Sequence, residues 1–344
     1  MKKQSKLLAL LLACAMTLAL SACGGSSATT STPASSAAPA ASGSAAATGD
    51  KTYTIGICQL VQHNALDAAT KGFKDALTEK LGDKVKFDEQ NAAGDSAACT
   101  TICNQFVSSN VDLIMANATP ALQAATAATN SIPILGTSVT DYGTALSIAD
   151  WKGTTGTNVT GTADLAPLDK QAEMIKTLFP DKKNVGILYC SAEPNSKYQS
   201  TEITKYLTDA GYTCKEYTFA DSNDVAAVTK TACDESDVLY VPTDNTAASC
   251  AESINNIAEP AKVPIVAGEA GICTGCGVAT LSIDYYDLGV VTGNMAYEVL
   301  VNGADPATTE IQFAPKTTYQ YMADRCEKLG VKVPSDYVAI EAEK

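Results

Sequence analysis

Polar side chains collect where apolar strand patterns end, and their types suit the binding of a small charged or polar solute. The stretch YVPTDNTAAS at residues 240–249 is the sharpest case, because its strand pattern stops at Pro242 and four polar residues follow. A tight turn needs only one or two such residues. Carboxylates suit an ammonium group, while hydroxyls and helix N-termini suit a carboxylate. We therefore interpret this stretch as part of a binding site.

Other predicted strands end in the same way. Ligands of open α/β sheets bind beyond the carboxyl ends of the strands, beside helix N-termini. The candidate ligand-binding residues at these ends are Gln59, His63, Thr119, Pro120, Thr137, Asp141, Ser191, Glu193, Asn195, Ser196, Asp244, Asn245 and Glu269. Within this set we assign a ligand ammonium group to Asp244, with Glu269 as its partner. The side chains that could line an apolar end of the site are Tyr142, Trp151, Tyr285 and Tyr286.

Each candidate also has an ordinary structural interpretation. Pro120 could simply fix a turn, and Thr119 or Asn245 could simply cap the next helix. Asp141 and Glu193 could be solvated loop charges. The hypothesis of one site depends on the whole set rather than on any single member.

The sequence offers little for catalysis, a cofactor or a metal. His63 is the one histidine, so a Ser-His-Asp or Cys-His arrangement has one candidate base and no motif around it. Walker-type and dinucleotide glycine signatures are absent. A zinc site would need two close cysteine pairs or more histidines. We expect a protein that binds its ligand without turnover, cofactor or metal.

Two stretches of the chain run in parallel and supply the elements that position these residues. Each gives a strand, a polar loop, a helix, a second strand, a capping Asp, another helix and a third strand. The matched landmarks are Gly56 with Gly186, Asp95 with Asp224, and Asp112 with Asp237. Strands alternating with helices predict βαβ units and parallel sheets. We expect two homologous α/β lobes, although any two α/β units are alike at this level.

The first 50 residues lie outside this expected fold. A basic start and the apolar stretch Leu7 to Leu20 precede Leu20-Ser21-Ala22-Cys23, which resembles the lipobox of bacterial lipoproteins. The resemblance implies a signal peptide at 1–22 and a lipidated Cys23. The alternative is an ordinary signal peptide, with Cys23 an incidental thiol. Residues 24–50 are rich in Gly, Ser, Ala, Thr and Pro, which is typical of a disordered linker.

Charge and cysteine content limit the partners and the compartment. The net charge is −14, from 24 basic and 38 acidic residues. So acidic a chain argues against nucleic acid and against docking on anionic lipid, which leaves the lipid anchor as the membrane contact. Beyond the leader and Cys23 we expect buried free thiols. A Cys273–Cys276 disulfide is the alternative, in a glycine-rich segment that we interpret as a loop.

Several motifs together resemble a known family. In chain order they are GICQLVQHNALDAATKGFKDAL, ANATPALQAA, NVTG, GILYCSAEPNS, YVPTDNTAAS and TLSIDYYDLGVVTGNMA. From about Tyr53 to the C-terminus the chain resembles the ABC transporter substrate-binding lipoproteins of the tryptophan/tyrosine type. The resemblance implies a type I periplasmic-binding-protein fold, with two Rossmann-like lobes of parallel sheets joined by a hinge. It places residues 51–160 and 285–314 in lobe 1, and residues 161–284 and 315–344 in lobe 2.

The resemblance also implies ligand contacts and a function. The motif-matched contacts are Thr119, Pro120, Thr137, Asn195, Ser196, Asp244 and Asn245. The chain departs from the family pattern at Ala192-Glu193-Pro194 and at Glu269. We expect a monomeric, lipid-anchored extracytoplasmic receptor that captures an amino acid, with an aromatic one favoured, and delivers it to an ABC permease. The alternatives are a sensor for a membrane signalling partner and a binder of a nucleoside or sugar-like ligand.

Overall fold

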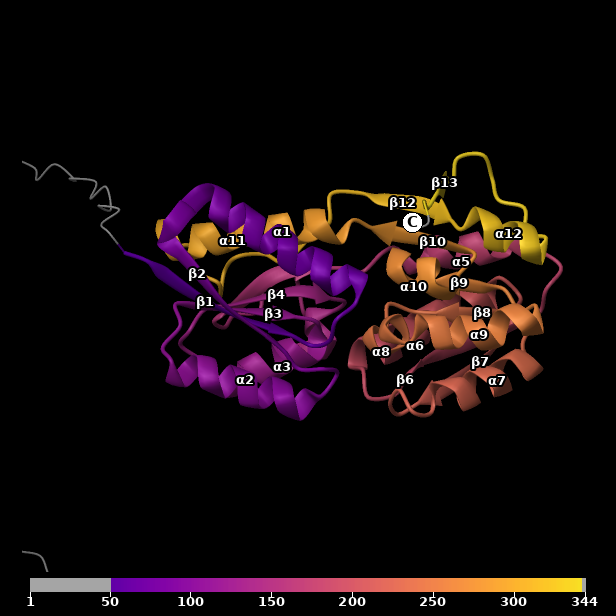
Figure 1. Ribbon diagram of the computed structural model, residues 1–344, viewed down its shortest axis with the longest axis horizontal. Coiled ribbons are helices and arrows are strands. Elements are labelled where there is room, and N and C mark those ends of the chain that lie inside the picture. The colour runs from indigo at the N-terminus through magenta and orange to yellow at the C-terminus, as the bar shows by residue number, and fades with distance from the viewer. Residues whose placement is uncertain (1–50, 342–344) are drawn as a thin grey trace, which may run out of the picture. The chain divides into compact units, whose positions relative to one another are not determined.

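The computed structural model describes residues 51–341, which form two α/β lobes, each with its own sheet (Figure 1). The predicted signal peptide, Cys23 and linker lie outside these residues. No helix between residues 51 and 341 has the length and hydropathy needed to cross a membrane.

The first lobe contains a sheet with the strand order β11-β5-β4-β3-β1-β2, in which every pair is parallel. Its strands are β1 (Tyr53–Gln59), β2 (Val85–Asn91), β3 (Leu113–Asn117), β4 (Ile134–Val139), β5 (Val159–Ala163) and β11 (Gln312–Phe313). Its helices are α1 (Asn64–Leu81), α2 (Ser96–Ser108), α3 (Thr119–Ala128), α4 (Tyr142–Leu146) and α11 (Tyr285–Asn302). The two faces of this sheet carry separate apolar clusters, because helices cover both faces.

The second lobe contains a sheet with the order β13-β12-β10-β9-β8-β6-β7, parallel except between β10 and β12. Its strands are β6 (Asn184–Cys190), β7 (Thr213–Phe219), β8 (Val238–Val241), β9 (Ile265–Ala267), β10 (Ala279–Ile283), β12 (Thr317–Tyr321) and β13 (Val338–Ala339). Its helices are α5 (Leu168–Leu178), α6 (Pro194–Asp209), α7 (Val225–Glu235), α8 (Asn245–Ser249), α9 (Ala251–Ala261), α10 (Ala270–Cys276) and α12 (Ala323–Leu329).

The two lobes repeat one topology, as the sequence predicted. The order β2-β1-β3-β4-β5 in the first sheet matches β7-β6-β8-β9-β10 in the second. Asp112 and Asp237 have the same role, since each accepts a backbone N–H at the start of its lobe's first strand, from Thr54 at 2.8 Å and from Asn184 at 2.9 Å. A parallel α/β architecture in two lobes is therefore confirmed.

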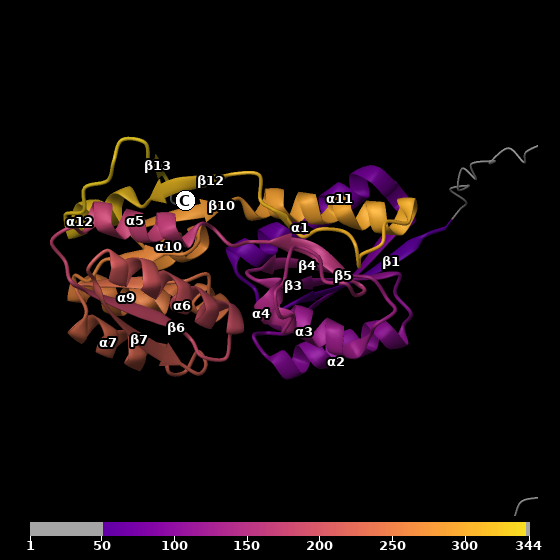
Figure 2. The ribbon, with the colours of Figure 1, turned by 180° about the vertical axis from the view of Figure 1, so that it is seen from behind.

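Three segments link the lobes, and they run together along the top of both views (Figures 1 and 2). They connect β5 to α5, β10 to α11, and β11 to β12. The predicted boundary at residues 160 and 161 falls inside β5, which pairs with β4 as far as Ala163. The first crossing therefore comes after Ala163, because the ladder of the first sheet continues through the NVTG motif.

Glycines let α1 and α11 pack backbone to backbone. A Cβ added at Gly289 would lie 2.0 Å from the carbonyl oxygen of Ala69, and one at Gly72 would lie 2.1 Å from that of Tyr286. Side chains at these positions would push the helices apart. This contact fixes the N-termini of both helices, which carry His63 and Tyr285 to the gap between the lobes.

Residues 270–276 form a helix, where the sequence analysis expected a loop. The carboxylate of Glu269 accepts the N–H groups of Gly271 and Ile272 at the start of α10. At the other end, the buried guanidinium of Arg325 donates to the carbonyls of Cys273, Thr274, Gly275 and Gly277. These two caps stabilise a short helix that its glycines disfavour. All ten cysteines among the described residues are free, Cys273 and Cys276 included.

Candidate ligand-binding site

Unpartnered polar atoms concentrate at the carboxyl ends of the strands that face the other lobe. Nine buried side-chain nitrogen or oxygen atoms of the described residues lack a hydrogen-bond partner within the protein. Five of them follow or end β1, β3, β4 and β6: His63 Nδ1, Asn117 Oδ1, Thr119 Oγ1, Ser138 Oγ and Asn195 Oδ1. Because unpaired buried polar groups are costly, this concentration indicates a place for a polar ligand.

The backbone at the same edge is strained. Ala118 has φ 92° and ψ 158°, a conformation nearly restricted to glycine, and Ser138 has φ 53°. Such residues cost about 1–3 kcal/mol each and cluster at ligand sites. Ala118 also precedes α3, which starts without a side-chain cap, so the N-terminus of this helix is open to an anionic group.

Four carboxylates are buried between the lobes without a buried cation beside them. They are Asp164, Glu193, Asp244 and Glu269, with exposed fractions of 4%, 3%, 1% and 2%. Among the described residues, Arg325 is the one buried Lys or Arg, and its guanidinium lies against the C-terminal carbonyls of α10. Buried carboxylates need either several donors or a positive charge.

Three of these carboxylates accept backbone N–H groups, most of them at helix starts. Glu269 caps α10, and Asp244 caps α8 through the Ala247 N–H at 2.7 Å while accepting the Cys190 N–H at 2.7 Å. The Glu193 carboxylate accepts both the backbone N–H and the amide of Asn245, at 3.0 and 2.6 Å. It also accepts the backbone N–H and hydroxyl of Thr246, each at 2.8 Å.

Asp164 differs, because its two donors from other residues are side-chain hydroxyls. Thr140 Oγ1 donates to Oδ1 at 3.1 Å, and Tyr285 OH donates to Oδ2 at 2.9 Å. Asp164 begins the first crossing, and Tyr285 follows the second. The pair joins two linking segments at the side of the interlobe gap.

Burial raises the pKa values of three of these carboxyls, those of Asp164, Asp244 and Glu269. Desolvation is the largest cause for Asp164, whose pKa rises to about 6, and nearby Glu269 raises it further. Desolvation, followed by the charge of Glu193, raises the pKa of Asp244 to about 8. Desolvation also raises the pKa of Glu269, and His63 opposes that effect. Part of this acidic group therefore carries protons near neutral pH when nothing positive is bound.

Within the described part of the chain, two side-chain hydrogen bonds cross directly between the lobes. His63, at the N-cap of α1, meets Asn245 at the start of α8, with 3.2 Å between Nε2 and Oδ1. Gln199 of α6 donates from Nε2 to Thr140 Oγ1 at 3.4 Å. Both bonds join residues that sit next to the buried carboxylates.

Some predicted site residues serve local structure. Gln59 bonds to Val61, Asp67 and Thr70 within its own lobe. Thr137 belongs to a buried hydroxyl cluster with Thr162 and Thr292. Asp141 caps α4, and the exposed Ser191 donates to the carbonyl of Phe219.

The other candidates gather at the gap. Those that lie buried there are Thr119, Pro120, Glu193, Asn195, Ser196, Asp244, Asn245 and Glu269, with half-buried His63 beside them. Of the aromatic candidates, Tyr142 and Trp151 stack on each other in the first lobe, with 6.2 Å between their ring centroids. Tyr286 is 37% exposed, which leaves Tyr285 as the buried tyrosine facing the carboxylates.

The sequence analysis missed Asp164 and Gln199. Asp164 follows β5 directly, so the rule of polar residues at strand ends would have found it. Gln199 lies one helical turn after Asn195, and its side-chain Oε1 accepts the backbone N–H of Thr243 at 3.0 Å. Helical spacing from Asn195 was the signal available for Gln199.

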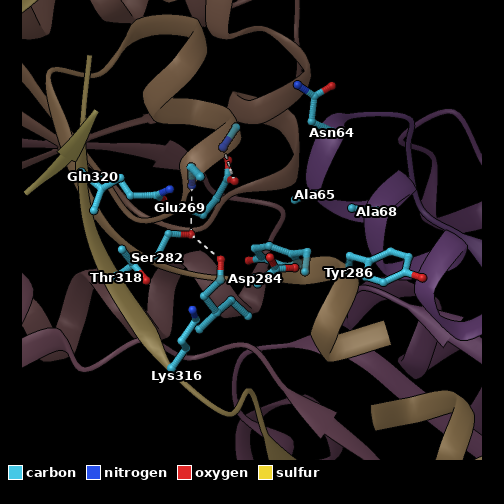
Figure 3. A pocket seen from close by; sticks show the side chains of 15 residues that line it. Asn64, Ala65, Ala68, Glu269, Ser282, Asp284, Tyr286, Lys316, Thr318 and Gln320 are labelled. Carbon is cyan, nitrogen blue, oxygen red and sulfur yellow. Dashed lines mark hydrogen bonds between the residues drawn. The ribbon is translucent and has the colours of Figure 1, made fainter. Parts of the chain in front are cut away.

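A hollow of about 490 Å³ opens next to the crossings, and Glu269 is the one of the four carboxylates that lines it (Figure 3). Glu269 and Ser282 lie on its second-lobe side, and Ala65 and Ala68 of α1 lie on the other. Tyr285 lines it as well. The volume lies in the usual range of small-molecule pockets.

Comparison with known proteins shows the family to which the chain belongs. Residues 54–344 match the family model described as ABC transporter substrate binding protein. The chain belongs to that family. Members of the family are extracytoplasmic.

Relatives of this ABC substrate-binding protein include a tyrosine-binding protein from Clostridioides difficile (strain R20291). The two are 40% identical over 265 residues, which covers 75% of this chain and 76% of the relative. A Streptococcus pneumoniae ABC domain in complex with L-Trp is 34% identical, with a TM-score of 0.79 and coverage of 83% of this chain and 97% of that one.

A third relative is a substrate-binding protein with adhesive properties from Clostridium difficile, solved in a ligand-free, open structure. It is 35% identical, with a TM-score of 0.65, and the match covers 85% of this substrate-binding protein and all of that chain.

The raised pKa values predict how the stability of the ligand-free protein depends on pH. The folded state binds these protons more tightly than the unfolded chain. The contribution of these protonated carboxyls to the free energy of unfolding is therefore present at low pH. It is lost as pH rises through about 6 for Asp164 and about 8 for Asp244. We expect the thermal midpoint to fall by about 5 °C or more between pH 5 and pH 8.5.

Scanning calorimetry of Asp164→Asn should show a flatter pH dependence near pH 6 than the parent protein. Asp209→Asn, an exposed change at the end of α6, should leave the pH dependence unaltered. A parent midpoint that stays constant or rises over this range would contradict the assignment of raised pKa values.

Proposed function

We propose that this substrate-binding protein captures an amino acid with an aromatic side chain between its lobes and delivers it to an ABC permease. The tyrosine-binding and tryptophan-bound relatives support the ligand class. The proposal involves binding without turnover, by a monomer.

The observation that carries this proposal is the group of four buried carboxylates, beside which residues 51–341 place no buried Lys or Arg. A ligand ammonium group would supply the missing positive charge. With a neutral sugar or nucleoside bound, the carboxyls would either stay protonated or ionise at a high cost in free energy. The chemistry of the gap therefore favours an amine over the alternative neutral ligands.

The first-lobe edge supports a place for the ligand's carboxylate. The open N-terminus of α3 offers backbone N–H groups and a positive helix end. The unpartnered hydroxyls of Thr119 and Ser138 lie at the same edge. An amino acid would then place its carboxylate at this edge and its ammonium group among the buried carboxylates.

The lobe arrangement agrees with a ligand-holding state. The chain matches the L-Trp complex with a higher TM-score than the ligand-free open structure, although the two identities are nearly equal. The bond between His63 and Asn245 across the gap supports the same interpretation. Ligand binding would shift an equilibrium between open and closed forms toward this arrangement.

We further propose that Cys23 is lipidated and holds the protein on the extracytoplasmic face of the membrane. The support is the lipobox-like Leu20-Ser21-Ala22-Cys23. Cys23→Ala should move the protein from the membrane fraction to the soluble fraction of bacteria that export it. Equal membrane recovery of both forms, with no lipid mass on Cys23, would contradict the anchor.

Titration calorimetry of the purified protein tests the ligand class. We expect saturable binding of L-tyrosine or L-tryptophan, and no measurable binding of glucose, ribose or adenosine. Asn195→Ala should weaken amino-acid binding by about 10-fold or more, because it removes a buried amide whose oxygen is unpartnered.

Asn104→Ala is the matched control, since Asn104 is exposed on α2 and the same atoms are removed. The control should keep the parent affinity. Binding of a neutral sugar or nucleoside, with no amino acid bound, would overturn the proposed function.

A further inference from the structure

We propose that Asp164 is the residue that holds the ammonium group of the ligand, a role that the sequence analysis gave to Asp244. This inference rests on the proposed function and specifies which carboxylate recognises the amine.

The hydrogen bonds separate Asp164 from the other three acids. Glu193 accepts from four groups of Asn245 and Thr246. Glu269 accepts two backbone N–H groups at the start of α10. Asp244 accepts one at the start of α8 and one from Cys190 at the end of β6. Turning any of these three toward a ligand would uncap a helix or free buried N–H groups.

Asp164 can bind an amine without such a loss. Its partners are the hydroxyls of Thr140 and Tyr285, at 3.1 and 2.9 Å, and each carboxylate oxygen can accept more than one donor. An ammonium group would add donors to the same oxygens while both hydroxyl bonds remain. Asp164 accepts two donors, as Asp244 and Glu269 do, but its donors are hydroxyls and not backbone N–H groups, so an added ammonium group would leave no buried N–H group without a partner.

The surroundings of Asp164 would favour a positively charged ligand group beside its carboxylate. The titratable groups that act on it or feel its charge are Glu269, Tyr285 and Tyr142, and none of them is a cation. Glu269 acts against its ionisation. A bound ammonium group would neutralise this repulsion, which a neutral ligand cannot do.

The position of Asp164 also connects binding to the hinge. It starts the crossing from β5 to α5, and its bond to Tyr285 reaches the crossing from β10 to α11. Thr140, its other partner, contacts Gln199 of the second lobe. A ligand ammonium group bound to Asp164 would therefore lie next to two of the crossings and next to a contact between the lobes.

The test compares ligands with and without the amine in parent and variant proteins. Titration calorimetry at pH 7.5 uses L-tyrosine and L-tryptophan, together with the des-amino acid of each. We expect the parent to prefer the amino acid by about 100-fold or more. Asp164→Asn should weaken amino-acid binding by at least about 30-fold and leave des-amino binding nearly unchanged, so that the preference collapses.

The exposed Asp209→Asn is the comparison variant, and it should keep the preference for the amine. A preference retained in Asp164→Asn would overturn the inference while leaving the proposed function intact. If the parent binds neither amino acid, the proposed function itself fails.

A second test measures the pH dependence of ligand affinity in the parent protein, so it does not require the variant to fold. Because the carboxyl must be ionised to hold the amine, parent affinity for the amino acid should fall up to about tenfold per pH unit below pH 6. Affinity for the des-amino acid should not fall in this way. Parallel pH profiles for the two ligands would contradict the role of Asp164.

Discussion

The burial of four carboxylates between the lobes is the constraint on which the rest of this structure depends. Ionised carboxylates cannot leave water without donors or countercharge. Three of them use the N–H groups at or beside the starts of α8 and α10, and thereby fix where those helices begin. The fourth, Asp164, uses two hydroxyls near the crossings. When these carboxyls are ionised, the gap between the lobes is negatively charged and can be neutralised by a bound cation.

Much of the fold serves to hold this group in place. Arg325 stabilises the far end of α10, whose first turn is capped by Glu269. The glycine contacts between α1 and α11 fix the helix starts that carry His63 and Tyr285. Strain at Ala118 and Ser138 lies on the opposite side of the gap, where free polar atoms also collect. The lobes therefore present complementary edges, one rich in carboxylates and one with hydroxyls and an open helix end.

The two-lobed fold could be predicted because strand and helix periodicity, capping acids and repeated landmarks are local signals. The gathering of Asp244, Asn245 and Glu269 could be predicted because strand ends meet at one edge of a parallel sheet. The individual roles could not. Whether Asp244 faces a ligand or the N–H of Cys190 depends on a contact between residues 54 positions apart. Asp164 meets Tyr285 across 121 positions, through a crossing whose place the sequence put slightly too early.

The central claim is that a ligand cation completes the buried carboxylate group. The most direct test of this claim is to measure the protons released when the ligand binds. Calorimetry of the binding of L-tyrosine or L-tryptophan, repeated in buffers of different ionisation enthalpy, gives the number of protons exchanged. The ammonium group lowers the carboxyl pKa values, so binding at pH 6 should release protons, and the number released should fall toward pH 8.5. Binding with no proton exchange at pH 6, or with proton uptake, would contradict the account.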